Sequence, residues 1–291
     1  WDWTFETLPT VPDIKLDEHQ YDLIYRMTEE RRYFQLEFDI RNHFRLGPVK
    51  YHNVIGVIPG TEFPEEYVIV GGHLDAYGVA TGGVDVGSGV TPSMEAARLI
   101  MEAGGKPRRT ILVILWAGEE FGLLGSLHWV EKFKADLENV SNMVNRDGGP
   151  TVPVSLTVSA SQMEDFREIA EVINTINPEF PLELKERTPR PRPERPWGTD
   201  SGPFAVYGVP TITFDCGDPK GYNFSYGEIW HTERDLYNTS IPEYQEQTAT
   251  ATAVLVYGLA NLDHLLSREG YYVEKVEEPS EPKKKERKRR K

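Results

Sequence analysis

Cysteine is nearly absent from this sequence, since the 291 residues contain only Cys216. A single thiol excludes an internal disulfide framework and any metal site built from several thiolates. A bound metal ion would therefore have to be held by histidine, aspartate and glutamate side chains.

Long apolar runs and an excess of basic residues are also missing. No run approaches the roughly 20 residues that a membrane-spanning helix needs, so we expect no membrane span. Residues 283–291 carry eight bases and one acid, or +7, and because the whole chain carries −14, the remainder carries −21. A body this acidic argues against nucleic acid as a partner. The basic run is expected to be a solvated, disordered end, and we assign it no function.

The length and ordinary composition predict a globular protein with a substantial core. Residues 1–45 are irregular in pattern, 46–268 read as one folded domain, and 269–291 as a charged, disordered tail. The chain begins at Trp1, and we expect it to be a fragment or processed form of a larger protein.

Apolar runs alternate with stretches of helical spacing. Strands are predicted over 53–60, 66–76, 108–117, 140–149, 154–160 and 209–217. Helices are predicted over 92–103, with Pro92 in the first turn, and over 126–135, 164–176 and 240–266. The alternation predicts a three-layer α/β/α fold with a mixed, centrally parallel sheet. Such sheets bind ligands beyond the carboxyl ends of their strands.

Acidic and histidine residues gather at those strand ends and in the loops that follow. They are His73, Asp75, Asp85, Glu119, Glu120, Asp147 and His231. Each alone has an ordinary explanation as a turn residue, a hydrogen-bonding group or a solvated charge. Adjacent carboxylates at the end of an apolar strand are harder to dismiss, because a cleft holding both needs a cation to offset their repulsion.

Five motifs occur in a fixed order: GGHLDA (71–76), GGVDVGSG (82–89), AGEEFGLLGS (117–126), NRDGG (145–149) and WHTERD (230–235). Over roughly residues 50–266 the chain resembles the co-catalytic zinc exopeptidases, which include bacterial double-zinc aminopeptidases, carboxypeptidase Q and glutamate carboxypeptidase. Any one motif alone is weak, whereas five in order are specific.

The resemblance implies a role for each clustered residue and two zinc ions per chain. His73, Asp85 and Asp147 would hold one zinc, and the same Asp85 would bridge to a second zinc. The second ion would also be held by Glu120 and His231. Glu119 would be the general base acting on a water between the metals, and Asp75 would accept the other imidazole N–H of His73 and orient the ring.

Weaker matches surround this set. Asp200 lies in a segment where the family carries an Asp-His pair, although Ser201 stands in the histidine position here. Asp235 is expected to have a structural hydrogen-bonding role. Tyr222 or Tyr226 would donate a hydrogen bond to the oxyanion or simply pack.

The residues that would choose the substrate depart from the family pattern. Trp230 replaces a tyrosine before the ligand histidine and could line a substrate pocket. Val86 stands where many of the aminopeptidases have asparagine. The stretch 211–214 contains no arginine, whereas the glutamate carboxypeptidase branch uses an arginine pair there. The arginines of the proline-rich segment 186–198 could approach a carboxylate.

The first expectation for function is therefore an aminopeptidase or dipeptidase acting on peptides. A carboxypeptidase of the carboxypeptidase Q or glutamate carboxypeptidase type is the main alternative, and glutaminyl cyclisation is another. A metal-free binding protein would have broken ligand positions, and here all are intact. By analogy with its relatives we expect the chain to be secreted or periplasmic. We also expect residues 8–40 to end a preceding protease-associated domain.

Overall fold

The computed structural model describes residues 5–7, 11, 14, 16, 18–41, 43, 47–78 and 80–273. The basic run and most of the expected tail lie outside these residues. A five-stranded sheet forms the centre, in the order β1 (Val54–Ile58), β3 (Arg109–Trp116), β2 (Phe63–His73), β4 (Val140–Asn145), β8 (Thr211–Ile212). Strand β1 is antiparallel to β3, and the remaining neighbours are parallel.

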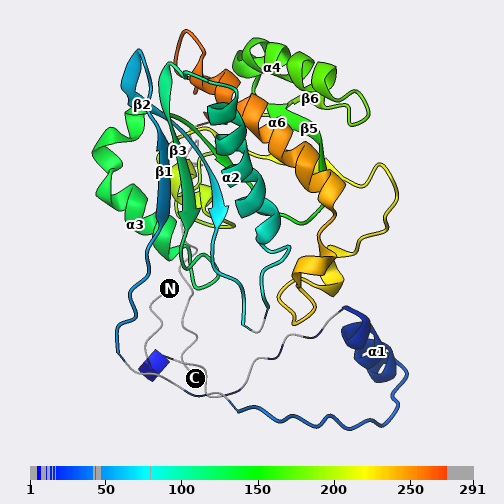
Figure 1. Cartoon of the computed structure of the whole chain (residues 1–291). Helices are drawn as coiled ribbons and strands as arrows, with labels where there is room; N and C mark the ends of the chain where they lie inside the picture. The colour runs from blue at the N-terminus through cyan, green and yellow to red at the C-terminus, as the bar shows by residue number, and fades with distance from the viewer. Residues whose placement is uncertain are drawn as a thin grey trace, which may run out of the picture.

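Helices cover both faces of this sheet (Figure 1). Helices α2 (Gly87–Glu102) and α6 (Pro242–Ala260) pack together on one face, and α3 (Leu124–Lys132) and α5 (Ser201–Val206) lie on the other. The predicted three-layer α/β/α fold with a mixed, centrally parallel sheet is confirmed. No helix of the described residues is long and apolar enough to cross a bilayer.

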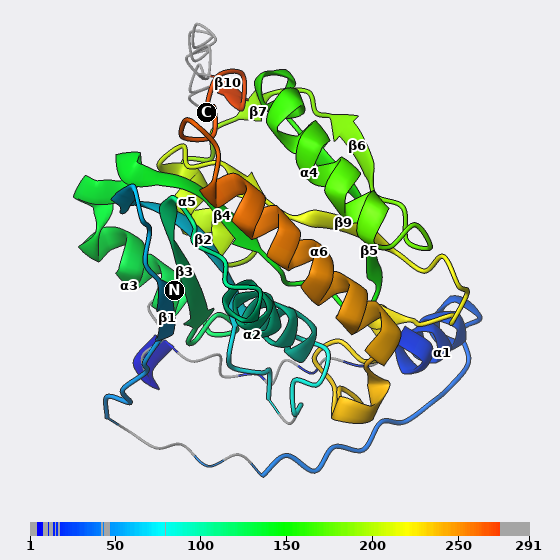
Figure 2. The same cartoon turned by 45° about the horizontal axis from the view of Figure 1, so that its top comes forward.

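A second, three-stranded sheet extends the molecule. Its order is β6 (Glu183–Glu186), β5 (Val152–Val158), β9 (Phe214–Gly217), and α4 (Met163–Ile176) lies beside it and against α6 (Figure 2). Strand β10 (Tyr272–Val273) pairs with β7 (Arg190–Pro191) in the proline-rich segment. The short 3-10 helices are η1 (Phe5–Thr7), η2 (Lys134–Asn139), η3 (Ala160–Gln162), η4 (Tyr226–Glu228) and η5 (Tyr237–Thr239).

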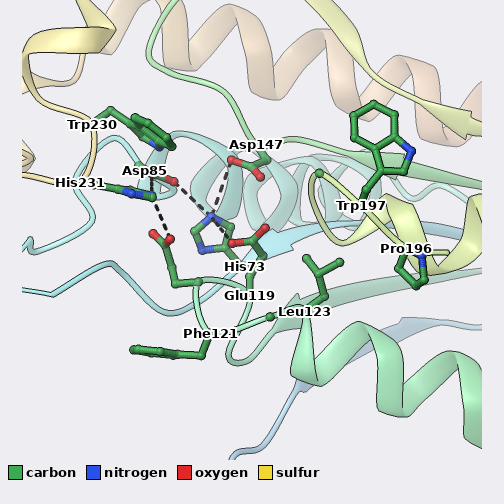
Figure 3. A pocket seen from close by; sticks show the side chains of 13 residues that line it. His73, Asp85, Glu119, Phe121, Leu123, Asp147, Pro196, Trp197, Trp230 and His231 are labelled. Carbon is green, nitrogen blue, oxygen red and sulfur yellow. Dashed lines mark ion pairs between the residues drawn. The ribbon is translucent and has the colours of Figure 1, made fainter. Parts of the chain in front are cut away.

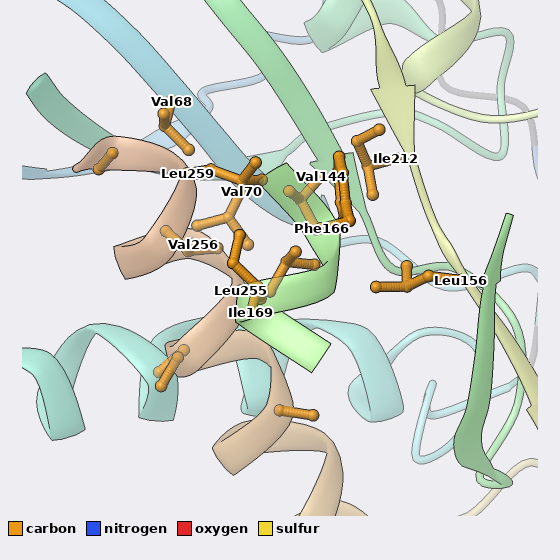
Figure 4. Packing of buried hydrophobic residues seen from close by; sticks show 14 of the residues in the cluster. Val68, Val70, Val144, Leu156, Phe166, Ile169, Ile212, Leu255, Val256 and Leu259 are labelled. Carbon is orange, nitrogen blue, oxygen red and sulfur yellow. The ribbon is translucent and has the colours of Figure 1, made fainter. Parts of the chain in front are cut away.

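The central strands are continuously apolar because both of their faces are buried. Side chains alternate along a strand, so Val68 and Val70 of β2 join the core under α2, α4 and α6, while Ile69 joins the core under α3 and α5. Figure 4 shows the first of these cores, where Leu255 and Leu259 of α6 pack over β2. A rigid double-sided sheet holds the strand ends, and the residues beyond them, in place.

Three elements differ from the prediction. Helix α2 begins at Gly87, so Pro92 lies inside the helix and not in its first turn. The glycines at its start indicated a loop, but Gly89 is required there because an added Cβ would lie 2.1 Å from the carbonyl oxygen of Arg146. The predicted strand 209–217 is divided between two sheets as β8 and β9, and α6 ends at Ala260 instead of near residue 266.

The N-terminal segment, predicted to be irregular, contains helix α1 (Glu18–Glu29). Ile24 and Met27 are at helical spacing and are its least exposed residues, but no residue of the helix is buried. Because charged and aromatic residues surround these two positions, the sequence shows no clear helical spacing of apolar residues here.

Candidate metal centre and active site

The parallel strands bring the predicted site residues to one edge of the sheet (Figure 3). His73 ends β2, Glu119 and Glu120 follow β3, and Asp147 follows β4. Since β2 lies between β3 and β4, the carboxyl ends of these strands meet. Two loops add the rest: Asp85 precedes α2, and His231 lies between η4 and η5.

One group of ligand atoms surrounds the imidazole of His73. Its Nε2 atom lies 3.2 Å from Oδ1 of Asp85 and 3.7 Å from Oδ1 of Asp147. Oε2 of Glu119 is 4.0 Å from the same nitrogen. His73 and Asp85 are almost fully buried, at 1% and 3% exposure.

A second group surrounds the imidazole of His231. Its Nε2 atom lies 2.9 Å from Oε2 of Glu120 and 3.5 Å from Oδ2 of Asp85. Asp85 thus presents one carboxylate oxygen to each histidine, as a bridging ligand would. Ligand atoms of His73, Asp85 and Glu120 all lie within 4.8 Å of one another.

The charges in this cluster are those of a site that needs a cation. Burial, reinforced by neighbouring carboxylates, raises the pKa of Glu119 to about 8 and that of Glu120 to about 7. Burial lowers the pKa of His73, but hydrogen bonds to Asp147 and Asp85 outweigh it and bring the pKa to about 12. The buried Oε1 atom of Glu120 has no hydrogen-bond partner among the described residues. Imidazole nitrogens and carboxylate oxygens are suitable zinc ligands, so these residues fit the metal.

Asp75 makes contacts that differ from those expected. Its backbone carbonyl, 2.9 Å from Nδ1 of His73, fixes the ring, while its carboxylate is 3.9 Å from that nitrogen. The carboxylate instead accepts hydrogen bonds from the backbone N–H groups of Glu119 and Glu120, at 3.0 and 3.2 Å. The sequence spacing placed Asp75 beside His73 but contained no information about which oxygen would face the ring.

Asp235 supports the loop that carries Asp85. Its fully buried carboxylate accepts hydrogen bonds from the backbone N–H groups of Val84, at 2.7 Å, and Asp85, at 3.0 Å. Gly83 touches the backbone of Leu236 so closely that an added Cβ would lie 2.2 Å from its carbonyl carbon. The contacts match the structural hydrogen bonding expected of Asp235.

The other weaker candidates differ in whether they contact the cluster. The hydroxyl of Tyr226 hydrogen-bonds to Asp85, and burial followed by nearby carboxylates raises its pKa. The hydroxyl of Tyr222 donates instead to Glu243 at 2.7 Å. Asp200 is fully buried and accepts a hydrogen bond of 2.5 Å from Ser126. Asp200 is not among the residues that line the pocket described next.

A pocket of about 530 Å³ opens onto the cluster. Apolar residues line the rest of this pocket: Phe121, Leu123, Pro196, Trp197 and Trp230. Trp230 was expected here. Trp197 was not, because its proline-rich segment carries no signal for a pocket wall. Tyr77, which stacks on the imidazole of His231, was likewise not predicted.

Three arginines of the proline-rich segment line an adjoining pocket of about 390 Å³. Arg190, Arg192 and Arg195 all border it, and it shares Trp197 and Gly198 with the pocket over the acidic cluster. A positively charged cavity thus continues from a negatively charged one.

Comparison with known sequences finds a match to the profile of Peptidase family M28 over residues 53–256. Carboxypeptidase Q from Xenopus laevis is 26% identical over 272 residues, covering 92% of this chain and 54% of that protein. Human carboxypeptidase Q is 30% identical over 216 residues, covering 74% of this chain and 43% of that protein. The chain spans about half the length of these curated relatives.

Solved structures share the fold. A peptidase M28 precursor from Shewanella amazonensis superposes with a TM-score of 0.68 at 24% identity, covering 85% of this chain and 53% of the other. A zinc aminopeptidase from Bacillus subtilis superposes with a TM-score of 0.55 at 22% identity, covering 70% and 49%. The family profile matches more than two thirds of the residues, in the order of the five motifs. The resemblance to zinc exopeptidases is therefore confirmed, and the chain belongs to Peptidase family M28.

Proposed function

We propose that this chain is the catalytic part of a zinc-dependent exopeptidase, an aminopeptidase that holds two zinc ions and uses Glu119 as general base. The observation that carries the proposal is the sharing of Asp85 between two histidine-containing groups. His73 and His231 face different oxygens of its carboxylate, at 3.2 and 3.5 Å.

The two groups of side chains would each hold one ion. His73 and Asp147 belong to the first, Glu120 and His231 to the second, and Asp85 to both. Bound zinc supplies Lewis acidity, which lowers the pKa of a bound water and stabilises a developing oxyanion. The Oε1 atom of Glu120, which has no hydrogen-bond partner among the described residues, suits a metal ligand. A buried carboxylate oxygen without a donor is costly unless a cation contacts it.

Glu119 is the residue suited to move the proton. It lines the pocket beside the candidate ligands, with Oε2 4.0 Å from Nε2 of His73, and it is the pocket carboxylate not assigned to a metal, so it is free to accept a proton. The carboxylate would take a proton from the attacking water and deliver it to the amine that leaves when the peptide bond breaks. The hydrogen bond from its own backbone N–H to Asp75 fixes the backbone at this position.

The shape of the pocket supports a short peptide as substrate. Its apolar wall offers contact to one side chain, and Glu119, the pocket carboxylate not assigned to a metal, offers an acceptor to a free amine. The volume of about 530 Å³ suits one or two residues and not a folded protein. This is why we propose an exopeptidase that removes an amino-terminal residue.

A carboxypeptidase or dipeptidase is a second candidate, favoured by the adjoining arginine pocket. A carboxylate at the end of a short substrate could pair with Arg190 or Arg195 there. The curated relatives named carboxypeptidase Q are consistent with this alternative. A dipeptide, with both ends free, could satisfy both pockets at once.

The test combines metal content with a peptide panel. Zinc per chain is measured by elemental analysis, and hydrolysis is measured on free, N-acetylated and C-amidated forms of the same di- and tetrapeptides. We expect two zinc ions, cleavage that requires the free amine, and a loss of kcat of about 10²- to 10⁴-fold in Glu119→Gln with zinc retained. Cleavage that needs the free carboxylate would assign the chain to the second candidate. A chain that binds no zinc would refute the proposal.

A further inference from the structure

The imidazole of His231 is enclosed between two aromatic rings. The ring centroid of Tyr77 lies 4.2 Å from that of His231 with an interplanar angle of 10°, and that of Trp230 lies 4.0 Å away at 29°. Two nearly parallel rings at this distance cannot share one face of an imidazole, so they must lie on opposite faces. Figure 3 shows Trp230 beside His231 at the edge of the pocket.

The backbone of His231 makes such support necessary. Its φ angle is 60°, in the left-handed region that non-glycine residues enter at a cost of about 1 kcal/mol or more. His231 also lies in a loop between two short 3-10 helices, not on a regular element. A side chain on such a segment needs packing to hold its rotamer.

The two rings fix the plane in which the Nε2 atom of His231 points. That atom faces Glu120 at 2.9 Å and Asp85 at 3.5 Å, and a rotation of the imidazole about its bond to Cβ would carry it away from both. An imidazole that binds a cation also becomes electron-poor, and the electron-rich faces of tyrosine and tryptophan attract such a ring. Stacking therefore favours the metal-binding orientation and the metal-bound state together.

We propose that Tyr77 and Trp230 are positioning residues that clamp the His231 ring and set the affinity of the metal site formed by Glu120 and His231. The inference rests on the proposed function and adds a specific asymmetry to it. The His73 site has no such clamp among the described residues, since its ring is held by the carbonyl of Asp75. Loss of the clamp should weaken the binding of the ion at Glu120 and His231 and leave the binding of the other ion unchanged.

Tyr77 is the better probe, because Trp230 also lines the pocket and its loss would alter substrate contacts. The variants are Tyr77→Ala, Tyr77→Phe, which keeps the ring, and Tyr77→Leu, which keeps apolar bulk without a ring. Tyr237→Ala, at a side chain that is 86% exposed, is the control. Zinc per chain is measured after dialysis against a series of chelator-buffered zinc concentrations. The thermal unfolding midpoint of each metal-free variant is measured in parallel.

The wild type and Tyr77→Phe should bind two ions with the same affinities. Tyr77→Ala and Tyr77→Leu should bind one ion about 10- to 100-fold more weakly, the scale of a lost contact to a ligand, and the other ion normally. A purely structural role would instead lower the midpoint of the metal-free chain and weaken both ions together. If the wild type binds two ions and both affinities are unchanged in Tyr77→Ala and Tyr77→Leu, the clamp is refuted and the proposed function is not. No zinc in the wild type would overturn the proposed function as well.

Discussion

The backbone N–H of Glu119 donates a hydrogen bond of 3.0 Å to the carboxylate of Asp75. The other carboxylate oxygen accepts from the N–H of Glu120, and the carbonyl of Asp75 faces the ring of His73. One residue thus positions the candidate base and two candidate ligands. The carboxylate acts on the loop after β3, whereas the backbone acts on the histidine.

Because the carboxylate and the backbone carbonyl of Asp75 have different partners, the effect of Asp75→Asn can be predicted. An amide keeps one acceptor oxygen but turns an NH₂ group toward a backbone donor, so the loop of Glu119 and Glu120 should shift. We expect kcat to fall about 10- to 100-fold while the zinc affinity of the His73 site stays close to normal. Steady-state kinetics with zinc analysis separates the two effects. Loss of zinc from the His73 site would show that the carboxylate orients the ring after all.

Asp235 gives a second prediction, on stability. Asp235→Ala leaves the buried N–H groups of Val84 and Asp85 unpaired, and each costs about 1–3 kcal/mol. The free energy of unfolding of the metal-free chain should fall by several kcal/mol, and zinc binding should weaken because Asp85 loses its support. Asp235→Asn, which retains one acceptor, should lie between. Urea unfolding with and without zinc measures both, and a wild-type stability in the alanine variant would contradict the assigned contact.

Much of the architecture was predictable because strands buried on both faces are continuous apolar runs in the sequence. The run RTILVILW of β3 is apolar on both faces and is a strand in the structure. The parallel arrangement of the central strands followed from their alternation with helices. The start of α2 could not be predicted, because glycines in a sequence indicate loops. Here Gly89 allows the helix to approach the backbone of Arg146 after β4, and Gly87 lies against the backbone of Gly82.

The site residues were predictable as a set, and their contacts were not. Motif order brought His73, Glu120 and His231 together before any geometry was known. The stacking of Tyr77 on His231 joins residues 154 positions apart and depends on how two loops fold across each other. Nothing local in the sequence encodes such a contact.

Asp200 predicts a dependence of stability on pH. Burial, partly offset by the hydrogen bond from Ser126, raises the pKa of this carboxyl from 3.8 to about 7 in the folded chain. Below pH 4 it is protonated in both states. Between about pH 4 and 7 the unfolded chain releases the proton and the folded chain keeps it, so the free energy of unfolding falls as pH rises.

Asp200→Asn should remove part of that fall, up to about 1.4 kcal/mol per pH unit at its steepest. The measurement is the urea midpoint of the metal-free chain at pH 4, 5, 6 and 7, with the exposed Asp263→Asn as the matched control. An unchanged slope in Asp200→Asn would show that the carboxyl is ionised throughout this range.

The arginine pocket yields the last prediction. Since it shares Trp197 and Gly198 with the pocket over the candidate metal site, the far end of a dipeptide bound there would enter it. We expect Arg195→Gln and Arg190→Gln each to lower kcat/KM about tenfold for a dipeptide with a free carboxylate, mostly through KM. A charge-assisted hydrogen bond of about 1.5 kcal/mol corresponds to that factor.

Two controls separate carboxylate binding from other effects of these substitutions. Hydrolysis of the C-amidated dipeptide should be unaffected. Arg98→Gln on α2, where the arginine pairs with Glu95, controls for the loss of one surface charge. Equal losses for the free and amidated peptides would mean that the arginines shape the pocket wall and do not bind the carboxylate.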